Sequence, residues 1–260
     1  MTESYYILSH KPVKYRCSTG KYKMLQCGAA VSDEKFGDEA DNTGTSISEK
    51  NKYWVETTGI YWIWKNCKSD IKGHTQYRRF LSVNLDLVPF ILQSKDIILA
   101  KPVSWGYSLE RVYSFTHNIA DLCDCEQIIK EKFPDYAEAY DKAMKRNKWL
   151  YFSNSFIARK EIYDDLCEFC FGVLEEFERR HKFTCYEDVY EHEKKFCDNF
   201  NFHEQIISDF KKGHPGIDDM ATLQSWVFGY LFERMLNVYV TKNSLNVYEC
   251  GDYVLNMIEK

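Results

Sequence analysis

The spacing of apolar residues changes near residue 109. Before that point short apolar segments alternate with polar loops, which predicts strands near residues 5–8, 24–31, 72–77 and 96–100. After it apolar residues recur every three or four positions, which predicts helices over residues 121–132, 136–145, 160–180 and 223–239. No linker rich in Pro, Gly or Ser separates the two parts. We therefore expect one α/β domain over residues 1–260, with a sheet in the N-terminal half and a largely helical C-terminal half.

Charge and hydropathy argue against two classes of protein. The formal net charge is -5, so the chain lacks the basic surface that duplex DNA or RNA requires, and we expect no nucleic acid partner. The first residues do not resemble a signal peptide, and no run of about 18 apolar residues occurs. We therefore expect a cytoplasmic protein, and contact with a membrane surface stays open.

The ten cysteines predict free thiols and not a metal or redox centre. Cys167 and Cys170 are spaced like one half of a zinc ribbon, but no second pair has that spacing. Their segment has a helical pattern and lacks the small or proline residues of a redox motif. In a reducing compartment such thiols behave as small apolar side chains, so we expect them in the core.

Two adjacent arginines stand beside aromatic residues at the end of a predicted strand. The segment is Tyr77-Arg78-Arg79-Phe80, at the end of the strand over 72–77. A guanidinium group is always charged, and its planar fork of donors matches phosphate oxygens. Nucleotides bind at the strand ends of α/β sheets. The two arginines are therefore candidate ligands of a diphosphate, with surface salt bridges as the alternative.

A helix predicted over residues 51–66 carries one carboxylate in an apolar stripe. On a helical wheel Glu56 lies within roughly 40° of both Ile60 and Ile63. A buried carboxylate without a partner costs several kcal/mol, so Glu56 either pairs with an arginine or is kept for a ligand. Arg78 and Arg79 are near enough in sequence for Glu56 to orient one of them. The aromatic residues of this helix are either core or a platform for a sugar ring.

A second carboxylate interrupts the apolar run over residues 226–239. Glu233 and Asn237 are four residues apart and share a helix face, whereas Glu233 and Arg234 do not. One interpretation is a polar face in water. The other is a carboxylate whose apolar surroundings tune its pKa for base chemistry.

Together these segments resemble a bacterial capsular and exopolysaccharide glycosyltransferase family, long catalogued as a domain of unknown function. The resemblance spans nearly the whole chain, and its strength lies in the order of many individually weak motifs. The residues that carry it are, in order, Ile7–Lys11, Gly28–Ala30, Ile47–Asn51, Glu56–Asn66, Tyr77–Phe80, Ile97–Pro102, His117, Pro134–Tyr136, Asn154 with Phe156 and Ile157, and Phe228–Asn237.

The resemblance implies a fold and a reaction. Members look like GT-A-type enzymes with a Rossmann-like mixed sheet that use UDP-sugars, and some are galactosyl or galactofuranosyl transferases. It implies inverting transfer of a hexose, galactose as pyranose or furanose, to a saccharide in capsular polysaccharide, exopolysaccharide or O-antigen synthesis. Residues 1–108 would bind the nucleotide sugar and residues 109–260 the acceptor. The implied acceptor is lipid-linked, which would bring the protein to the inner face of the plasma membrane.

The resemblance also suggests which residues contact the nucleotide sugar. One departure is visible, because the family usually has His before Tyr-Arg-Arg, whereas this chain has Gln76, with His74 two residues earlier. The small residues of the set would let the backbone approach the nucleotide closely. The nucleotide-sugar set is Ser9, His10, Lys11, Gly28, Ala29, Asp41, Asn42, Asn51, Tyr77 and Asn154.

Catalysis is expected from two carboxylates and two arginines. Glu56 and Glu233 are the candidates for the base that deprotonates the acceptor hydroxyl. Arg78 and Arg79 would neutralise the leaving diphosphate. No Asp-x-Asp follows a clear strand, so we predict no metal ligands and no cofactor, with Mn²⁺ or Mg²⁺ as the alternative. A noncatalytic carbohydrate-binding partner remains the competing hypothesis, while a phosphate-binding hydrolase lacks a nucleophile motif.

Overall fold

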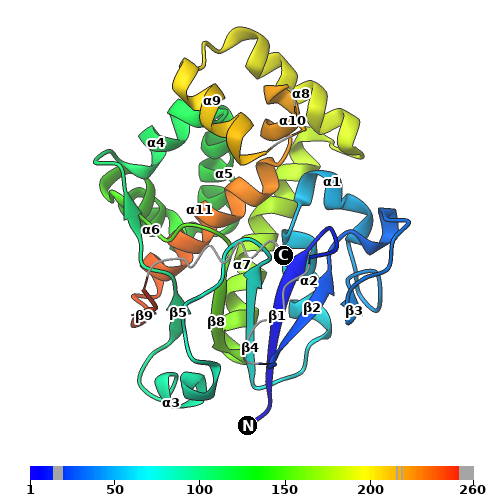
Figure 1. Cartoon of the computed structure of the whole chain (residues 1–260). Coiled ribbons are helices and arrows are strands. Elements are labelled where there is room, and N and C mark those ends of the chain that lie inside the picture. The colour runs from blue at the N-terminus through cyan, green and yellow to red at the C-terminus, as the bar shows by residue number, and fades with distance from the viewer. Residues whose placement is uncertain (14–19, 215, 218, 252–260) are drawn as a thin grey trace.

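A seven-stranded mixed sheet forms the centre of the fold (Figure 1). The structure is a computed structural model, and it describes residues 1–13, 20–214, 216–217 and 219–251. The strand order is β3-β2-β1-β4-β8-β5-β9, and β6 and β7 form a separate pair. The strands are β1 (Glu3–Ser9), β2 (Tyr22–Gln26), β3 (Glu39–Ala40), β4 (Ile71–Gln76), β5 (Ile97–Leu99), β6 (Val103–Ser104), β7 (Trp149–Leu150), β8 (Phe156–Arg159) and β9 (Val247–Glu249).

The first four strands are parallel, and the sheet becomes mixed beyond them. β1 lies between β2 and β4 and pairs with both in parallel, while β2 pairs with β3 in the same way. β8 is antiparallel to β4 and to β5, and β9 is parallel to β5. The α/β class with a mixed sheet is therefore confirmed. The sheet extends beyond the N-terminal half, because β8 and β9 come from the second part of the chain.

Helices make up most of the chain after residue 109. Figure 1 shows α4, α5, α8, α9 and α10 gathered beyond the C-terminal end of β1. The α-helices are α1 (Asn51–Trp54), α2 (Thr57–Asn66), α3 (Val88–Ile91), α4 (Leu109–Thr116), α5 (Ile119–Lys132), α6 (Ala137–Tyr140), α7 (Lys160–His181), α8 (Tyr186–Asn199), α9 (Glu204–Gly213), α10 (Met220–Gln224) and α11 (Val227–Lys242). Short 3-10 or π turns cover Ala29–Val31, Ser48–Lys50, Leu85–Leu87, Pro134–Tyr136 and Asp141–Arg146.

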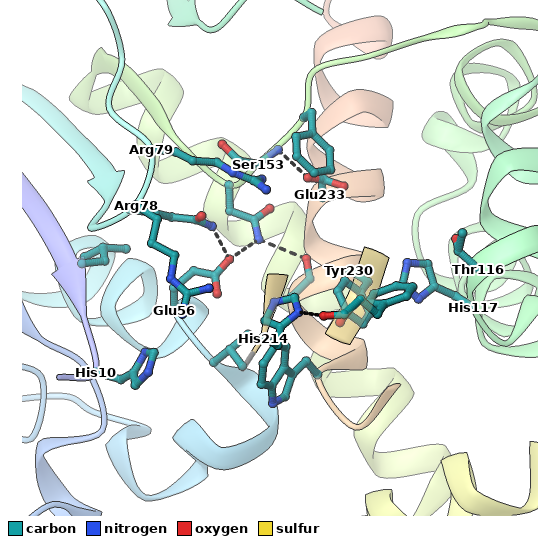
Figure 2. Close-up of a pocket in the computed structure, with 18 of the residues that line it drawn as sticks. His10, Glu56, Arg78, Arg79, Thr116, His117, Ser153, His214, Tyr230 and Glu233 are labelled. Carbon is teal, nitrogen blue, oxygen red and sulfur yellow. Dashed lines mark hydrogen bonds between the residues drawn. The ribbon is translucent and has the colours of Figure 1, made fainter. Parts of the chain in front are cut away.

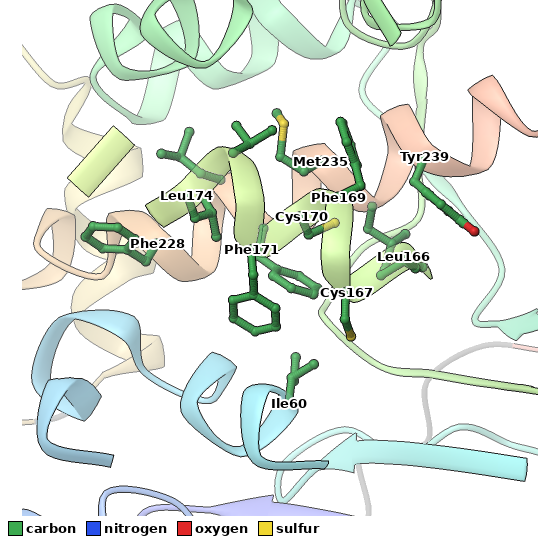
Figure 3. Close-up of a cluster of buried hydrophobic side chains, with 14 of the residues drawn as sticks. Ile60, Leu166, Cys167, Phe169, Cys170, Phe171, Leu174, Phe228, Met235 and Tyr239 are labelled. Atoms are coloured by element: carbon green, nitrogen blue, oxygen red, sulfur yellow. The ribbon is translucent and has the colours of Figure 1, made fainter. Parts of the chain in front are cut away.

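Each face of the sheet has its own apolar cluster, because side chains alternate along a strand. Tyr6 and Leu8 of β1 join the larger cluster, whereas Tyr5 joins the smaller one. The larger cluster contains the buried faces of α7 and α11, and Figure 3 shows their side chains meeting Ile60 of α2. The smaller cluster is covered by the segment that contains α3. One face of the sheet is therefore covered by the long helices α7 and α11, and the other face by the short segment that contains α3.

The predicted elements near the sheet and the long helices are largely confirmed, but the helix over 51–66 is wrong. Val55 has a φ of 47°, a left-handed conformation that a β-branched residue rarely adopts, and the helix breaks there into α1 and α2. The break lies before Glu56, whose backbone is helical and whose carbonyl accepts from the Ile60 N–H, so the wheel relation of Glu56 to Ile60 and Ile63 holds within α2. The two isoleucines are fully buried, whereas Glu56 is half-buried.

Helices α8 and α9 were not predicted. α8 buries Val189 and Glu193, and Tyr186, Tyr190 and Phe196 lie half-buried on the same helix face, an apolar stripe that was overlooked. The prediction of cysteines in the core is confirmed in part: Cys167 and Cys170 are fully buried among apolar side chains (Figure 3), whereas Cys123 and Cys185 are exposed. Cys17 lies outside the described residues. Within the described part of the chain, no helix combines the length and apolar character needed to cross a membrane.

Candidate functional site

A cavity of about 980 Å³ lies between the ends of the parallel strands and the helices beyond them (Figure 2). We name its two sides by their residues. The strand-side wall consists of the lining residues Leu8, Ser9, His10, Lys11, Cys27, Asn51, Lys52, Val55, Glu56 and Gln76–Arg79. The helix-side wall consists of Trp105, Tyr107, Val112, Phe115, Thr116, His117, Phe152–Asn154, Ile206, Phe210, His214, Ile217, Trp226, Gly229, Tyr230, Glu233 and Arg234.

The strand-side wall follows from the order of the strands. β2 and β3 lie on one side of β1, and β4 lies on the other, so the chain changes direction across the sheet between β1 and β4. Ligands of α/β proteins bind beside the carboxyl ends of the strands at such a point. Because β1 and β4 are parallel, residues 9–11 and 76–79 emerge there together. Two segments that are far apart in sequence thus meet at one site.

Positive charge is concentrated around Tyr77. The His10 ring lies 5.4 Å from the Tyr77 ring, Lys11 Nζ 5.6 Å from its centre and the Arg78 guanidinium 5.1 Å from it. Arg79 stacks over Phe152 at 4.5 Å. Burial lowers the pKa of His10, and the charges of Lys11 and Arg78 lower it further. All three cations line the cavity, with Lys11 exposed and both arginines half-buried, and such a cluster suits a polyanion.

Glu56 follows directly after the break at Val55 and lines the cavity. Its carboxylate Oε1 accepts hydrogen bonds from Gln76 Nε2 at 2.7 Å and from Asn154 Nδ2 at 2.9 Å. Figure 2 shows Glu56 on the same side of the cavity as Arg78 and Arg79. These two hydrogen bonds come from neutral amides, so the expected arginine pairing is not what holds this oxygen. Gln76, the departure from the family motif, contacts Glu56 directly.

A buried histidine fixes the residue that holds Glu56. His74 Nε2 donates to the backbone oxygen of Asn154 at 2.6 Å, and Tyr163 donates its hydroxyl to His74 Nδ1 at 3.0 Å. Burial lowers the pKa of His74 to about 3, so the ring is neutral at pH 7 and uses one nitrogen as donor and the other as acceptor. Asn154 Nδ2 also donates to the carbonyl of Gly229 at 3.0 Å. Asn154, whose amide contacts Glu56, is thus held by His74 at its backbone oxygen and by Gly229 at its side chain.

Glu233 is paired with its own neighbour, contrary to the sequence prediction. Arg234 Nη1 donates to Glu233 Oε2, and the backbone N–H of Ser153 donates to Oε1 (Figure 2). Both side chains are buried, at 7% and 5% exposure, so neither lies on a water-facing surface. Burial raises the pKa of Glu233, while Arg234, the Ser153 N–H and Arg79 oppose that rise. The carboxylate is therefore held in place by its surroundings.

Four of the predicted nucleotide-sugar residues lie outside the cavity lining. The buried Asp41 carboxylate accepts from the backbone N–H groups of Gly28 and Ala29 at 2.9 and 3.0 Å, and from Thr58 Oγ1 at 2.7 Å. Gly28 has a φ of 73°, and a Cβ there would lie 2.5 Å from the Asn51 side chain. These residues brace the loop behind Asn51. The fourth, Asn42, is exposed.

The other ten predicted site residues line the cavity. They are Ser9, His10, Lys11, Asn51, Glu56, Tyr77, Arg78, Arg79, Asn154 and Glu233. Glu56 and Glu233 are the carboxylates in the lining. Within the described residues, the one group with the spacing of metal ligands is Asp121, His192 and Glu193, and none of these three lines the cavity.

Comparison with known proteins identifies the family. The model of a domain of unknown function, DUF4422, matches residues 4–200. The chain belongs to this family. The fold is similar to the apo structure of WbbM, described as a bifunctional glycosyltransferase, with a TM-score of 0.69 and 22% identity over 96% of this chain. The chain spans 44% of that structure. A search of curated proteins found no match.

The helix-side wall contains residues that the sequence did not single out. Trp105, Tyr107 and Phe115 are each partly exposed, and His117 stacks on Tyr230 at 4.1 Å. His117 Nδ1 donates to Gln224 Oε1 at 2.9 Å, and burial lowers its pKa to about 3. His117 is one of the residues that carry the family resemblance, and that resemblance was the sequence signal that could have identified it as part of the site. The aromatic residues come from separate segments, and much of this wall lies beyond residue 200, where the family match ends.

Proposed function

We propose that this protein is a glycosyltransferase that moves a hexose, galactose as pyranose or furanose, from a UDP-sugar to a saccharide acceptor with inversion. The observation that carries the proposal is one cavity in which Arg78 and Arg79 lie with the carboxylates of Glu56 and Glu233. Cations beside a diphosphate and a carboxylate beside the acceptor are the two groups that glycosyl transfer requires. Family membership and the WbbM fold support the same reaction class.

The donor diphosphate binds at the strand-side wall. Lys11, Arg78 and Arg79 supply fixed positive charge around Tyr77, and the nucleoside lies over Ser9, His10 and Asn51. As the bond from the sugar to UDP breaks, negative charge grows on the leaving oxygen, and the arginines stabilise it without a metal. Gly28, Ala29 and Asp41 act from behind by bracing the loop. In this assignment no step of the reaction requires a divalent ion.

Glu56 is the general base. Its Oε1 is held by Gln76 and Asn154, which orients the carboxylate while leaving it able to accept a proton. The proton of the acceptor hydroxyl passes to Glu56 as that oxygen attacks the anomeric carbon from the face opposite UDP. Glu233 is engaged by Arg234 and Ser153, so it serves to hold the wall that faces Glu56.

The acceptor binds at the helix-side wall. Trp105, Tyr107 and Phe115 present partly exposed ring faces, which pack against the apolar face of a sugar. In this assignment residues 1–108 bind the donor and residues 109–260 the acceptor within a single domain. The acceptor is a lipid-linked saccharide of a capsular, exopolysaccharide or O-antigen pathway, met at the cytoplasmic face of the membrane.

Calorimetry with UDP and a UDP-release assay test the proposal. The assay compares UDP-galactose, UDP-glucose and their N-acetyl forms, each with EDTA and with Mn²⁺. We expect UDP to bind in EDTA and one donor to be hydrolysed slowly. The variant Arg78→Lys is compared with Arg179→Lys, which alters an exposed arginine paired with Glu176.

The variant pair separates a phosphate site from general charge effects. Lys lacks the planar fork, so we expect Arg78→Lys to weaken UDP binding about 10-fold and Arg179→Lys to leave it unchanged. Turnover that requires Mn²⁺ would refute the metal-independent mechanism. Folded protein that binds saccharide without releasing UDP from any donor would instead favour the noncatalytic carbohydrate-binding hypothesis.

A further inference from the structure

Three side chains with metal-ligand spacing meet where α5 packs near α8. Asp121 lies in the first turn of α5, and His192 and Glu193 are adjacent on α8. One ligand atom of each lies within 4.8 Å of the others. His192 Nε2 is 2.8 Å from Asp121 Oδ1 and 4.0 Å from Glu193 Oε1. Two ligands of one zinc ion, each about 2.0–2.1 Å from the metal, lie about 3 Å apart, so a small side-chain adjustment suffices.

The two carboxylates are buried without enough donors. Both Asp121 and Glu193 have side chains that are 1% exposed. Asp121 Oδ1 accepts from His192 and from Asn118 Nδ2 at 3.3 Å. Among the described residues, no hydrogen-bond donor reaches Asp121 Oδ2 or either oxygen of Glu193. Two such carboxylates side by side are unfavourable unless a cation or a shared proton compensates them.

We propose that Asp121, His192 and Glu193 form a zinc site that fastens α8 to α5. One imidazole nitrogen and two carboxylate oxygens suit zinc, whereas magnesium and calcium prefer all-oxygen sets. The His192 side chain is 25% exposed, which leaves an entry path and a fourth position for water. The site is separate from the diphosphate cations, so it does not depend on the proposed function.

The zinc site supports the helix-side wall. α8 packs on α10, which carries Gln224. Gln224 accepts from His117 and donates to the backbone oxygen of Thr116 at 2.9 Å, and both partners line the cavity. Because α8 buries few apolar residues, a metal cross-link supplies stability that its sequence does not. Loss of zinc should therefore destabilise the helix-side wall before it destabilises the sheet.

Zinc titration of the full chain tests the site. Protein stripped with EDTA and dialysed is titrated with ZnCl₂ by calorimetry, and its Tm is followed in parallel. The test variant is Glu193→Gln, which keeps the shape and can donate to Asp121. The matched control is Asp124→Asn, because Asp124 pairs with His181 at 3.0 Å on the same surface and is half exposed.

We expect wild type and Asp124→Asn to bind one zinc ion and to gain Tm with zinc. Glu193→Gln should bind more than about 100-fold more weakly, since even partners behind the ligands are worth about 10–100-fold in affinity. Co²⁺ added to wild type should give the visible absorption of a low-coordinate site. If Glu193→Gln does not fold, His192→Gln replaces it, because His192 is partly exposed.

Two results would overturn the site. Wild type that neither binds zinc nor gains Tm, alongside a Glu193→Gln protein at least as stable, would mean that the carboxylates share a proton. Equal loss of binding in Asp124→Asn and Glu193→Gln would mean that zinc binds adventitiously at the surface histidines.

Discussion

The two walls of the cavity are built in different ways. The strand-side wall comes from a few short segments, each at the end of a strand, at the start of α1 or at the junction of α1 and α2. The helix-side wall gathers side chains from separate segments between residues 105 and 234. Charge dominates the first wall and aromatic rings the second. The difference implies separable tasks, with anion binding on one side and recognition of an apolar sugar face on the other.

Replacement of the carboxylate on each wall by an amide should give the largest difference between the two walls. Glu56→Gln keeps both amide contacts but cannot accept a proton, so kcat should fall about 1,000-fold while UDP affinity stays near wild type. Glu233→Gln leaves Arg234 buried without its partner and should cost about 3 kcal/mol of stability with a smaller loss of kcat. Steady-state kinetics and urea unfolding measure both. Full turnover by Glu56→Gln would remove it as the base.

Truncation of one cavity-facing side chain on each wall should separate donor from acceptor binding. Arg79→Ala removes charge-assisted hydrogen bonds to the diphosphate and should weaken UDP binding about 100-fold. Trp105→Ala should leave UDP affinity within about 2-fold, since its half-exposed ring belongs to the helix-side wall. Calorimetry with UDP measures both variants. An equal loss in Trp105→Ala would show that the nucleotide spans both walls, and the proposed division would be wrong.

The sequence predicted the strand-side wall better because its signals are local. Arg78, Arg79 and the residues after β1 follow apolar strand segments, so their position at strand ends could be inferred. The break at Val55 could not, because apolar residues continue on both sides of it. Gln76 and Asn154, the amide partners of Glu56, come from distant segments of the chain and were also missed.

The helix-side wall depends on packing that a single sequence does not display. α8 and α9 carry apolar residues at helical spacing, among them Val189 and Phe196 in α8 and Ile206 and Phe210 in α9, but these short stripes were overlooked and neither helix was predicted. The pairing of Glu233 with Arg234 was missed because adjacent helical residues ordinarily point apart. Here burial leaves the guanidinium few partners, and it reaches the neighbouring carboxylate. Asp41 was predicted to contact the nucleotide sugar, but it lies outside the cavity lining and braces the loop at Gly28.

Acid should destabilise both walls through their buried histidines. His74 supports the strand-side wall and His117 lies in the helix-side wall, and burial lowers the pKa of each to about 3. The unfolded chain binds these protons below about pH 6.5 and the native state does not. Stability is therefore lost as pH falls from about 6.5 towards 3, by about 1.4 kcal/mol per pH unit for each histidine.

The variants His74→Gln and His117→Gln isolate each contribution. In His117→Gln the new amide can still donate to Gln224. The free energy of unfolding of this variant should therefore approach or exceed that of wild type as the pH falls, because unfolding of the variant takes up one proton fewer. Urea unfolding at several pH values between 4 and 7 measures the difference. An unchanged slope for either variant would show that its imidazole is protonated in the native state.

The smallest expected effect concerns one valine on each wall. Val55 and Val112 are both half-buried and line the cavity, but Val55 alone has a positive φ. Replacement of Val112 by Gly in α4 should cost about 2 kcal/mol through lost packing and helix propensity. Val55→Gly loses similar packing, but it also relieves backbone strain of about 1–3 kcal/mol, so its net cost should stay below about 1 kcal/mol.

Urea unfolding of Val55→Gly and Val112→Gly measures this difference, and kinetics add a second readout. Because Val55 immediately precedes Glu56, Val55→Gly should loosen the backbone that carries the base and lower kcat several-fold even though it barely changes stability. A glycine would adopt the backbone conformation of Val55 without strain. Strain at this residue therefore indicates that the placement of the neighbouring side chain matters more there than stability. Equal costs for the two variants would instead mean that the left-handed turn carries no strain, and Glu56 would then owe its orientation to Gln76 and Asn154 alone.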